Sequence, residues 1–244
     1  MSRKCRLLIS LNPFRVQNPE RVRNKRYRNT TLKRLKIKII ILEIKEPIEF
    51  GKYYHIYNRG NNSADVFFET ENYLHFLKSY AKYIEPVAET FAWCLLKNHF
   101  HILVRIKDFS EIKIEEMTYS TKEKPKVIDA SRQFSHLFNS YTQSINKRYH
   151  RTGSLFEKPF ERKLVTNEKY LKNLIYYIHN NPVHHGFVKS LDLYKWSSFS
   201  TILSNKLTKL KRNDVIEFYG GLDNFILNHY QDNNFNEILD LLIE

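Results

Sequence analysis

The chain has 244 residues, of which 42% are hydrophobic and 14% aromatic, and it carries a formal charge of +14. This length and composition allow one well-buried domain with appendages, and they exclude a globally disordered chain. The two cysteines, Cys5 and Cys94, lie far apart, which excludes a disulfide framework and fits a reducing cytoplasm. No stretch approaches the ~18 apolar residues of a membrane span, and "RLLISL" is too short for a convincing signal peptide.

Most of the positive charge lies near the N-terminus. Residues 1–45 hold fourteen Lys and Arg residues against Glu20 and Glu43, so this segment carries +12 of the +14. It is interpreted either as a solvated, flexible tail or as an arm that binds a polyanion in a salt-sensitive way. A start codon assigned too far upstream is a third explanation. Basicity alone therefore identifies no site, and residues 1–48 are taken as a basic N-terminal extension.

The predicted elements begin with a strand from Lys52 to Asn58, ended by a turn at 59–62. Apolar residues at helical spacing predict a helix in "ETENYLHFLKSYAKYIEP", stopped by Pro86. The runs "ETFAWCLLK" and "HFHILVRI" predict two strands joined closely, as in a hairpin. Residues 108–128 are polar and unperiodic, which predicts a mobile loop.

A long helix is predicted from Asp129, its N-cap, to a close at Gly153. The run "PFERKLV" predicts a further short strand. The last helix of this region is predicted in "TNEKYLKNLIYYIHNNP", with Thr166 or Asn167 as cap and Pro182 as stop.

The order β-α-β-β-α-β-α indicates an α+β fold, with a ferredoxin-like antiparallel sheet and helices on one face. Residues 49–203 are predicted to form this domain, with 187–203 as an aromatic wrap over its core. Residues 204–244 predict a small helical C-terminal appendage, broken at Gly220–Gly221.

His99 and His101 are the first candidates for chemistry. They alternate along a predicted strand, so both side chains project to the face opposite Phe100. Two neutral imidazoles at that spacing can hold one divalent cation and leave positions for oxygen ligands. The alternative is a pair of hydrogen-bonded structural histidines, and His-x-His alone does not decide between the two.

Tyr177 and Asn181 are the second pair of candidates, four apart and therefore on one helical face. Asn181 precedes Pro182, which places it in the final turn, where its amide oxygen is free to point outward. A phenol beside a metal site can act as a covalent nucleophile, while the metal polarises a scissile phosphate. The alternative is that the aromatic residues here only pack on the sheet.

Taken together, these motifs resemble the REP-associated tyrosine transposases, relatives of the one-tyrosine transposases of the HUH endonuclease superfamily. Each motif alone is degenerate, but all of them in the family's order are specific. The matching segments span about residues 50–200 and read "YYHIYNRGNN", "KNHFHILVRI", "GSLFEKPFERKLV", "YYIHNNPVHHGFV" and "YKWSSF".

The resemblance implies that His99 and His101 coordinate a divalent metal, that Asn181 completes the protein ligands, and that Tyr177 is the nucleophile. It implies Mg²⁺ or Mn²⁺, with zinc as the geometric competitor. The insertion-sequence relatives usually carry glutamine at the third ligand position, so Asn181 with its shorter arm departs from them.

Substitutes for two of these roles stay open. His179, His184 or His185 would replace Asn181 as a ligand if the helix ended earlier. Tyr176 is the fallback nucleophile, although it points roughly 100° away from Tyr177 on a helix.

The implied reaction is transesterification on single-stranded DNA that forms a hairpin from a palindromic repeat. Tyr177 attacks a backbone phosphate, giving a 5′-phosphotyrosyl enzyme and a free 3′-hydroxyl, and another 3′-hydroxyl reverses the step. The implied setting is the cytoplasm of a prokaryote, at its nucleoid. The candidate phosphate contacts, each otherwise an ordinary surface charge, are Arg59, Lys97, Arg132, Lys147, Arg148, Arg151, Lys158, Arg162 and Lys163.

Two other functions compete with this one. The first is a non-catalytic protein that binds repeat hairpins on the same scaffold, as a domesticated transposase would. The second is a zinc hydrolase, which the absence of an HExxH motif and of a clustered cysteine pair makes weak. Insertion-sequence relatives exchange their tyrosine helices in dimers, whereas REP-associated proteins can act as monomers, so monomer and homodimer both stay open.

Overall fold

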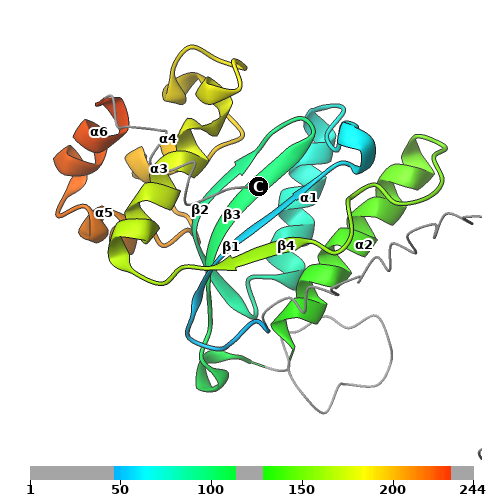
Figure 1. The fold of residues 1–244 in the computed structure, drawn as a ribbon, viewed down its shortest axis with the longest axis horizontal. Coiled ribbons are helices and arrows are strands. Elements are labelled where there is room, and N and C mark those ends of the chain that lie inside the picture. The colour runs from blue at the N-terminus through cyan, green and yellow to red at the C-terminus, as the bar shows by residue number, and fades with distance from the viewer. Residues whose placement is uncertain (1–46, 114–128, 232–244) are drawn as a thin grey trace, which may run out of the picture. The chain divides into compact units, whose positions relative to one another are not determined.

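A computed structural model describes residues 47–113 and 129–231 of the chain. Its centre is a four-stranded antiparallel sheet in the order β2-β3-β1-β4 (Figure 1). The strands are β1 (Tyr53–Arg59), β2 (Ala88–Leu95), β3 (His99–Ile106) and β4 (Glu161–Leu164). Strands β1 and β3 are central because each β-α-β half inserts one strand beside that of the other half. The predicted ferredoxin-like sheet is therefore confirmed.

Three helices accompany the sheet, and three shorter ones follow. They are α1 (Thr70–Tyr83), α2 (Ala130–Arg148), α3 (Glu168–His184), α4 (Phe199–Leu203), α5 (Arg212–Phe218) and α6 (Leu222–Tyr230). Two predicted caps are present: Asp129 accepts from the backbone N–H of Arg132, and Asn167 accepts from that of Tyr170. The predicted stop at Pro182 was wrong by two residues, because proline in a last turn removes only one backbone hydrogen bond.

Several predictions lie outside the described residues. These are almost all of the basic extension, most of the predicted loop at 108–128 and the end of the appendage. The division into an extension, a catalytic domain and an appendage stays a prediction. Within the described ranges, no helix is both long enough and apolar enough to cross a membrane.

The two faces of the sheet are covered by different helices. Ile56, Phe100 and Ile102 point to the face that α1 and α2 cover, and they share one hydrophobic core with those helices. Leu103 and Phe91 point to the other face, where they join a second core with α3 (Figure 1). The prediction of helices on one face is thus wrong for α3. Leu103 of β3 and the apolar residues Phe91, Ala92 and Cys94 of β2 lie on this second side, so it also needs a cover.

The C-terminal helices pack on α3. Val215 of α5 and Phe225 of α6 belong to the same core as Leu174 of α3. The predicted break at Gly220–Gly221 separates α5 from α6, and both glycines have positive φ, 73° and 127°. The appendage therefore extends the core that holds α3 in place.

Candidate active site

The histidine pair lies at the start of β3, on the face that α3 covers. His99 stands opposite Arg59 of β1, and His101 stands opposite Tyr57. The two rings meet edge to face, with their centroids 5.2 Å apart. His101 is buried and His99 half-buried, so the pair sits at the margin of the core rather than within it.

Helix α3 brings two further side chains to this pair. Oδ1 of Asn181 lies 3.1 Å from Nε2 of His99. The ring of Tyr177 stands edge to face with the ring of His101, at a centroid distance of 5.2 Å. Since α3 covers the histidine face of the sheet, the four predicted residues converge from two segments that are far apart in the chain.

Each histidine uses its Nδ1 for a contact away from Asn181. Nδ1 of His99 lies 2.8 Å from Oδ1 of Asn98. Nδ1 of His101 lies 3.0 Å from Nε2 of His55. Both rings therefore have Nε2 left as the nitrogen that can take a further partner, and in His99 this atom faces Asn181.

His55 is a member of this cluster that the sequence analysis did not name. It is buried on β1, its ring is tilted against that of Tyr57 at a centroid distance of 4.6 Å, and it stands edge to face with Tyr177 at 6.3 Å. The available signal was alternation: Tyr53, His55 and Tyr57 share one face of a strand. That face becomes the histidine face only once the pairing of β1 with β3 is known.

Burial keeps these imidazoles neutral. It lowers the pKa of His55 to about 3, with a smaller contribution from the charge of Lys163. It lowers the pKa of His99 to about 4, although the hydrogen bond with Asn181 acts in the opposite direction. Burial and then the neighbouring histidines hold the pKa of His101 well below its usual 6.5. Each ring near pH 7 therefore carries one N–H and one lone pair.

Of the residues predicted as substitutes, two histidines lie near the histidine pair, and the other two residues lie away from it. The exposed ring of His185 lies 5.1 Å from that of His99, and His184 lies beside His185. His179 points away and contacts His229, as does the fallback nucleophile Tyr176. Within the described residues, no three His, Cys, Asp or Glu side chains are grouped as a metal site. Asn181 as the third protein ligand therefore stays a prediction, and His185 is the predicted substitute that lies beside His99.

The outer side of α3 is fixed by a chain of hydrogen bonds. Nδ1 of His229 donates to the carbonyl of Phe225 at 2.8 Å, so its Nε2 accepts from Nδ1 of His179 at 2.9 Å. Nε2 of His179 then accepts from Oγ of Ser198 at 2.8 Å, and that oxygen accepts from the backbone N–H of Trp93. Since residue 179 lies about 200° around the helix from 177 and 181, this chain holds α3 from behind the site.

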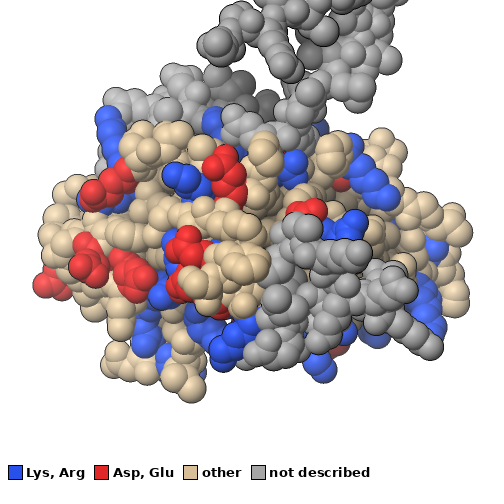
Figure 2. Space-filling model, turned by 90° about the horizontal axis from the view of Figure 1, so that it is seen from below, with Lys and Arg blue, Asp and Glu red and all other residues tan. Residues whose placement is uncertain are grey.

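The predicted phosphate contacts do not form one surface. Arg59 and Lys163 lie on the histidine face, since they pair with His99 and His55. Lys97 lies in the β2–β3 turn beside them, whereas Arg162 points to the opposite face and donates to Ser131 of α2. The others lie on α2 or in the segment that follows it: Arg132, Lys147, Arg148, Arg151 and Lys158. On the face in Figure 2, acidic and basic side chains of the described residues are interspersed.

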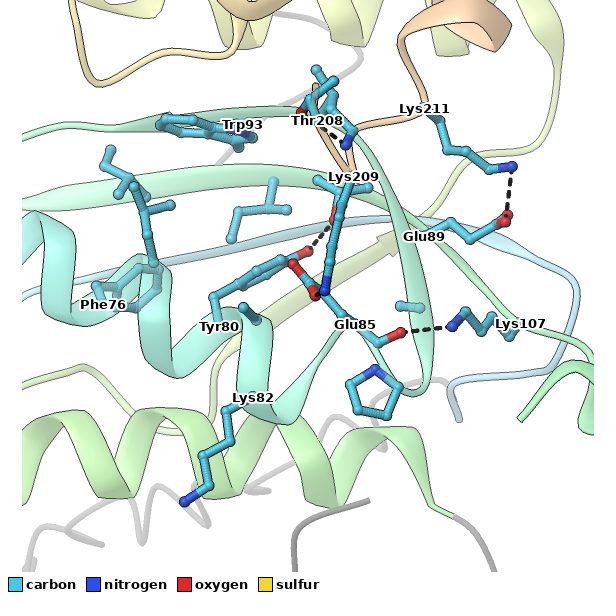
Figure 3. A pocket seen from close by; sticks show the side chains of 18 residues that line it. Phe76, Tyr80, Lys82, Glu85, Glu89, Trp93, Lys107, Thr208, Lys209 and Lys211 are labelled. Carbon is cyan, nitrogen blue, oxygen red and sulfur yellow. Dashed lines mark hydrogen bonds and ion pairs between the residues drawn. The ribbon is translucent and has the colours of Figure 1, made fainter. Parts of the chain in front are cut away.

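A sizeable pocket lies away from the histidine face. A pocket of about 830 Å³ opens between α1, β2 and residues 208–211 (Figure 3). Its charged groups largely pair with one another, since Lys209 contacts Glu85 at 2.6 Å and Lys211 contacts Glu89 at 3.0 Å. No histidine lines it. We therefore place the candidate chemistry at the histidine face, where neutral imidazoles converge, and not in this pocket.

Comparison with known proteins bears on the family resemblance and on the fold. No family model matches the chain. It is 30% identical over 115 residues to a putative REP-associated tyrosine transposase of Haemophilus influenzae. The matched region covers 46% of this chain and 58% of that relative. The chain thus spans little more than half the length of the curated relative. This match confirms the resemblance that the motifs predicted.

The fold is shared with a solved structure described as a REP-associated tyrosine transposase bound to a REP hairpin. The TM-score is 0.50 at 18% identity, over 67% of this chain and 86% of that chain. Two structures of a bacterial tRNA(His) guanylyltransferase-like protein, with GTP and with ATP, reach only 0.35 and 0.36 at 8% identity. The first of these likenesses confirms the fold.

Proposed function

We propose that this chain, as its resemblance to the REP-associated tyrosine transposases implies, is a metal-dependent endonuclease and strand transferase for single-stranded DNA. It cleaves and rejoins hairpin-forming repeat DNA through a 5′-phosphotyrosine. The observation that carries the proposal is the approach of Tyr177 and Asn181 to His99 and His101 on one face of the sheet. The names of the curated relative and of the solved structure support the DNA substrate.

The distances support a metal site of octahedral type. Two neighbouring ligands of an octahedral ion with bonds of about 2.1 Å lie about 3 Å apart. Nε2 of His99 and Oδ1 of Asn181 are 3.1 Å apart. The buried Nδ2 of Asn181 has no hydrogen-bond partner among the described residues, so only the oxygen end of this amide is engaged. His99, His101 and Asn181 would hold the ion, and nitrogen with oxygen ligands suits Mn²⁺ or Mg²⁺.

Proton accounting at His99 supports the same site. The neutral ring has one N–H, yet it lies between two amide oxygens, Asn98 at Nδ1 and Asn181 at Nε2. One N–H satisfies only one of them. With the proton on Nδ1, Nε2 and the Asn181 oxygen turn lone pairs toward each other. A cation between them would bind both atoms, because each can donate its lone pair to it.

The covalent chemistry belongs to Tyr177. Its phenolic oxygen forms a bond to the scissile phosphorus and gives up its proton, while the bond from phosphorus to the 3′-oxygen breaks and that oxygen gains a proton. A bound divalent cation supplies charge neutralisation for the phosphate in the transition state. One phosphodiester replaces another, so rejoining by a second 3′-hydroxyl needs no external energy source.

Substrate binding would involve the basic side chains nearest the histidines. Arg59 and Lys97 are each more than half exposed, and their acidic partners, Glu157 and Asp65, are at the surface too. Exposed ion pairs of this kind contribute little to stability. A phosphate can therefore displace these carboxylates at small cost, and Lys163 extends the same face.

The test is capture of covalent DNA. The full chain is incubated with a library of single-stranded hairpins and Mg²⁺ or Mn²⁺, and adducts that survive denaturation are sequenced. The Tyr177→Phe variant should lose the adduct and keep DNA binding, whereas Tyr176→Phe, its matched neighbour, should keep both. A normal adduct yield from Tyr177→Phe would refute the assignment.

A second candidate is a non-catalytic protein that binds repeat hairpins. The feature that favours it is Asn181, which is shorter than the glutamine usual in the insertion-sequence relatives. This function would show itself as metal-independent hairpin binding, with no adduct on any member of the library.

A further inference from the structure

We propose that His55 is a positioning residue for the metal site: it accepts the Nδ1–H of His101 and so presents the Nε2 lone pair of that ring to the cation. This inference rests on the proposed function, since it concerns the same ion. It assigns a role to a buried histidine of the first strand that the reaction itself does not use.

The geometry fixes the two rings firmly. His55 lies on β1 and His101 on β3, the two central strands, so their backbones are held by the sheet. The rings are stacked at a centroid distance of 5.1 Å with 24° between their planes. Nε2 of His55 lies 3.0 Å from Nδ1 of His101. Rotation of the His101 ring would break this bond and change the direction in which its Nε2 points.

Two neutral rings in such a contact have two ways to share their protons. In one, Nδ1–H of His101 donates to His55, and Nε2 of His101 keeps its lone pair. In the other, Nε2–H of His55 donates, the proton of His101 sits on Nε2, and that ring cannot bind a metal. A histidine that binds a metal through one nitrogen typically donates its other N–H to a neighbour. Only the first arrangement is compatible with a bound ion.

The surroundings of His55 fit this role better than a structural one. Buried polar atoms in a core are normally all hydrogen-bonded. Nδ1 of His55 is buried and has no hydrogen-bond partner among the described residues, so His101 is the one partner that holds this ring there. If His55 served stability alone, its unpaired Nδ1 would lower the stability of the fold. If His55 serves to orient His101, the single hydrogen bond from its Nε2 is sufficient.

Asn98 stands in the corresponding position for the other ligand. Its Oδ1 lies 2.8 Å from Nδ1 of His99, which leaves Nε2 of that ring directed at Asn181. Both candidate ligands thus meet an acceptor at Nδ1. One acceptor comes from the neighbouring residue and the other from the neighbouring strand.

The experiment measures Mn²⁺ affinity calorimetrically in the full chain, without DNA. The His55→Leu variant removes the acceptor, and we expect the dissociation constant to rise roughly 10- to 100-fold. The His55→Gln variant places an amide oxygen near the position of Nε2, and its dissociation constant should stay within about threefold of the wild type. Thermal unfolding of both variants checks whether they are folded.

Several outcomes would overturn the inference. One is an unchanged affinity in His55→Leu, and another is an equal loss in the leucine and glutamine variants, which would indicate packing alone. If neither variant folds, ¹⁵N spectra of histidine-labelled wild type with Mg²⁺ decide: the inference requires the Nδ1–H form of His101. Wild type that binds no Mn²⁺, or binds it unchanged after replacement of His99 and His101, would instead refute the proposed metal site.

Discussion

The amide oxygen of Asn181 lies 3.1 Å from Nε2 of His99, although 82 positions separate the two residues in the chain. This contact joins the end of α3 to the start of β3, and Asn181 is fully buried there. Whether the pair holds a cation or only a hydrogen bond has consequences that can be measured.

Replacing Asn181 separates these two cases. The Asn181→Asp variant places a carboxylate at a fully buried position, which lowers stability without metal because an uncompensated charge is buried. Mn²⁺ should restore that stability, so its addition should raise the Tm of this variant more than that of the wild type. Asn181→Leu, the control without an oxygen, should show no metal-dependent rise. Equal shifts in all three proteins would argue against Asn181 as a ligand.

Acid should destabilise the fold through its buried histidines. The pKa of His55 is about 3 and that of His229 about 4 in the folded chain, both lowered by burial from 6.5. Below pH 6.5 the histidines of the unfolded state therefore bind protons that those of the folded state do not bind. The free energy of unfolding falls as the pH drops toward 4. Above pH 6.5 these groups contribute no pH dependence. Urea unfolding at pH 7, 6 and 5 measures the slope, which should be smaller in His229→Gln.

The hydrogen-bond chain behind α3 should matter for both stability and chemistry. His229→Leu leaves Nδ1–H of His179 buried without its acceptor, which should cost about 1–3 kcal/mol in the free energy of unfolding. Adduct formation should fall as well, because α3 carries Tyr177. The matched control His229→Gln offers a side-chain oxygen to His179 and should recover part of both losses. Full stability in His229→Leu would show that the chain of bonds contributes nothing.

The salt dependence of DNA binding tests the basic residues near the histidines. Arg59→Gln and Lys163→Gln should each weaken hairpin binding, and each should reduce the slope of log K against log salt by about 1. Lys209→Gln is the control, since Lys209 is equally a surface lysine but contacts Glu85 at the large pocket. Filter binding at several salt concentrations measures these slopes. A slope that changes only in the control would place the DNA on the other side of the molecule.

Local patterns predicted much of this architecture, because they depend on neighbours in the chain. Alternation along a strand placed His99 and His101 on one face, and the capping residues Asp129 and Asn167 placed two helix starts. The i, i+4 spacing likewise placed Tyr177 and Asn181 on one side of α3.

What the sequence did not predict depends on pairing between distant segments. His55 joins the cluster only because β1 pairs with β3 in a register that sets Tyr57 opposite His101. His179 has the same residue type as the candidate ligands, yet the helical rotation that brings Asn181 to His99 turns His179 toward α6. The side of the sheet that α3 covers is also set by tertiary packing, because β2 and β3 together contribute apolar residues to both faces of the sheet.

The packing of α5 and α6 on α3 limits how copies of this protein can cooperate. In a homodimer that exchanges α3 between its two copies, residues 168–231 would have to be exchanged as one unit. Otherwise Val215 and Phe225 would lose their packing against α3. Only the three residues between β4 and α3 are available as a hinge for such an exchange. Tyr177 and Asn181 lie beside His101 and His99 of the same chain, so one copy carries all four residues of the proposed site.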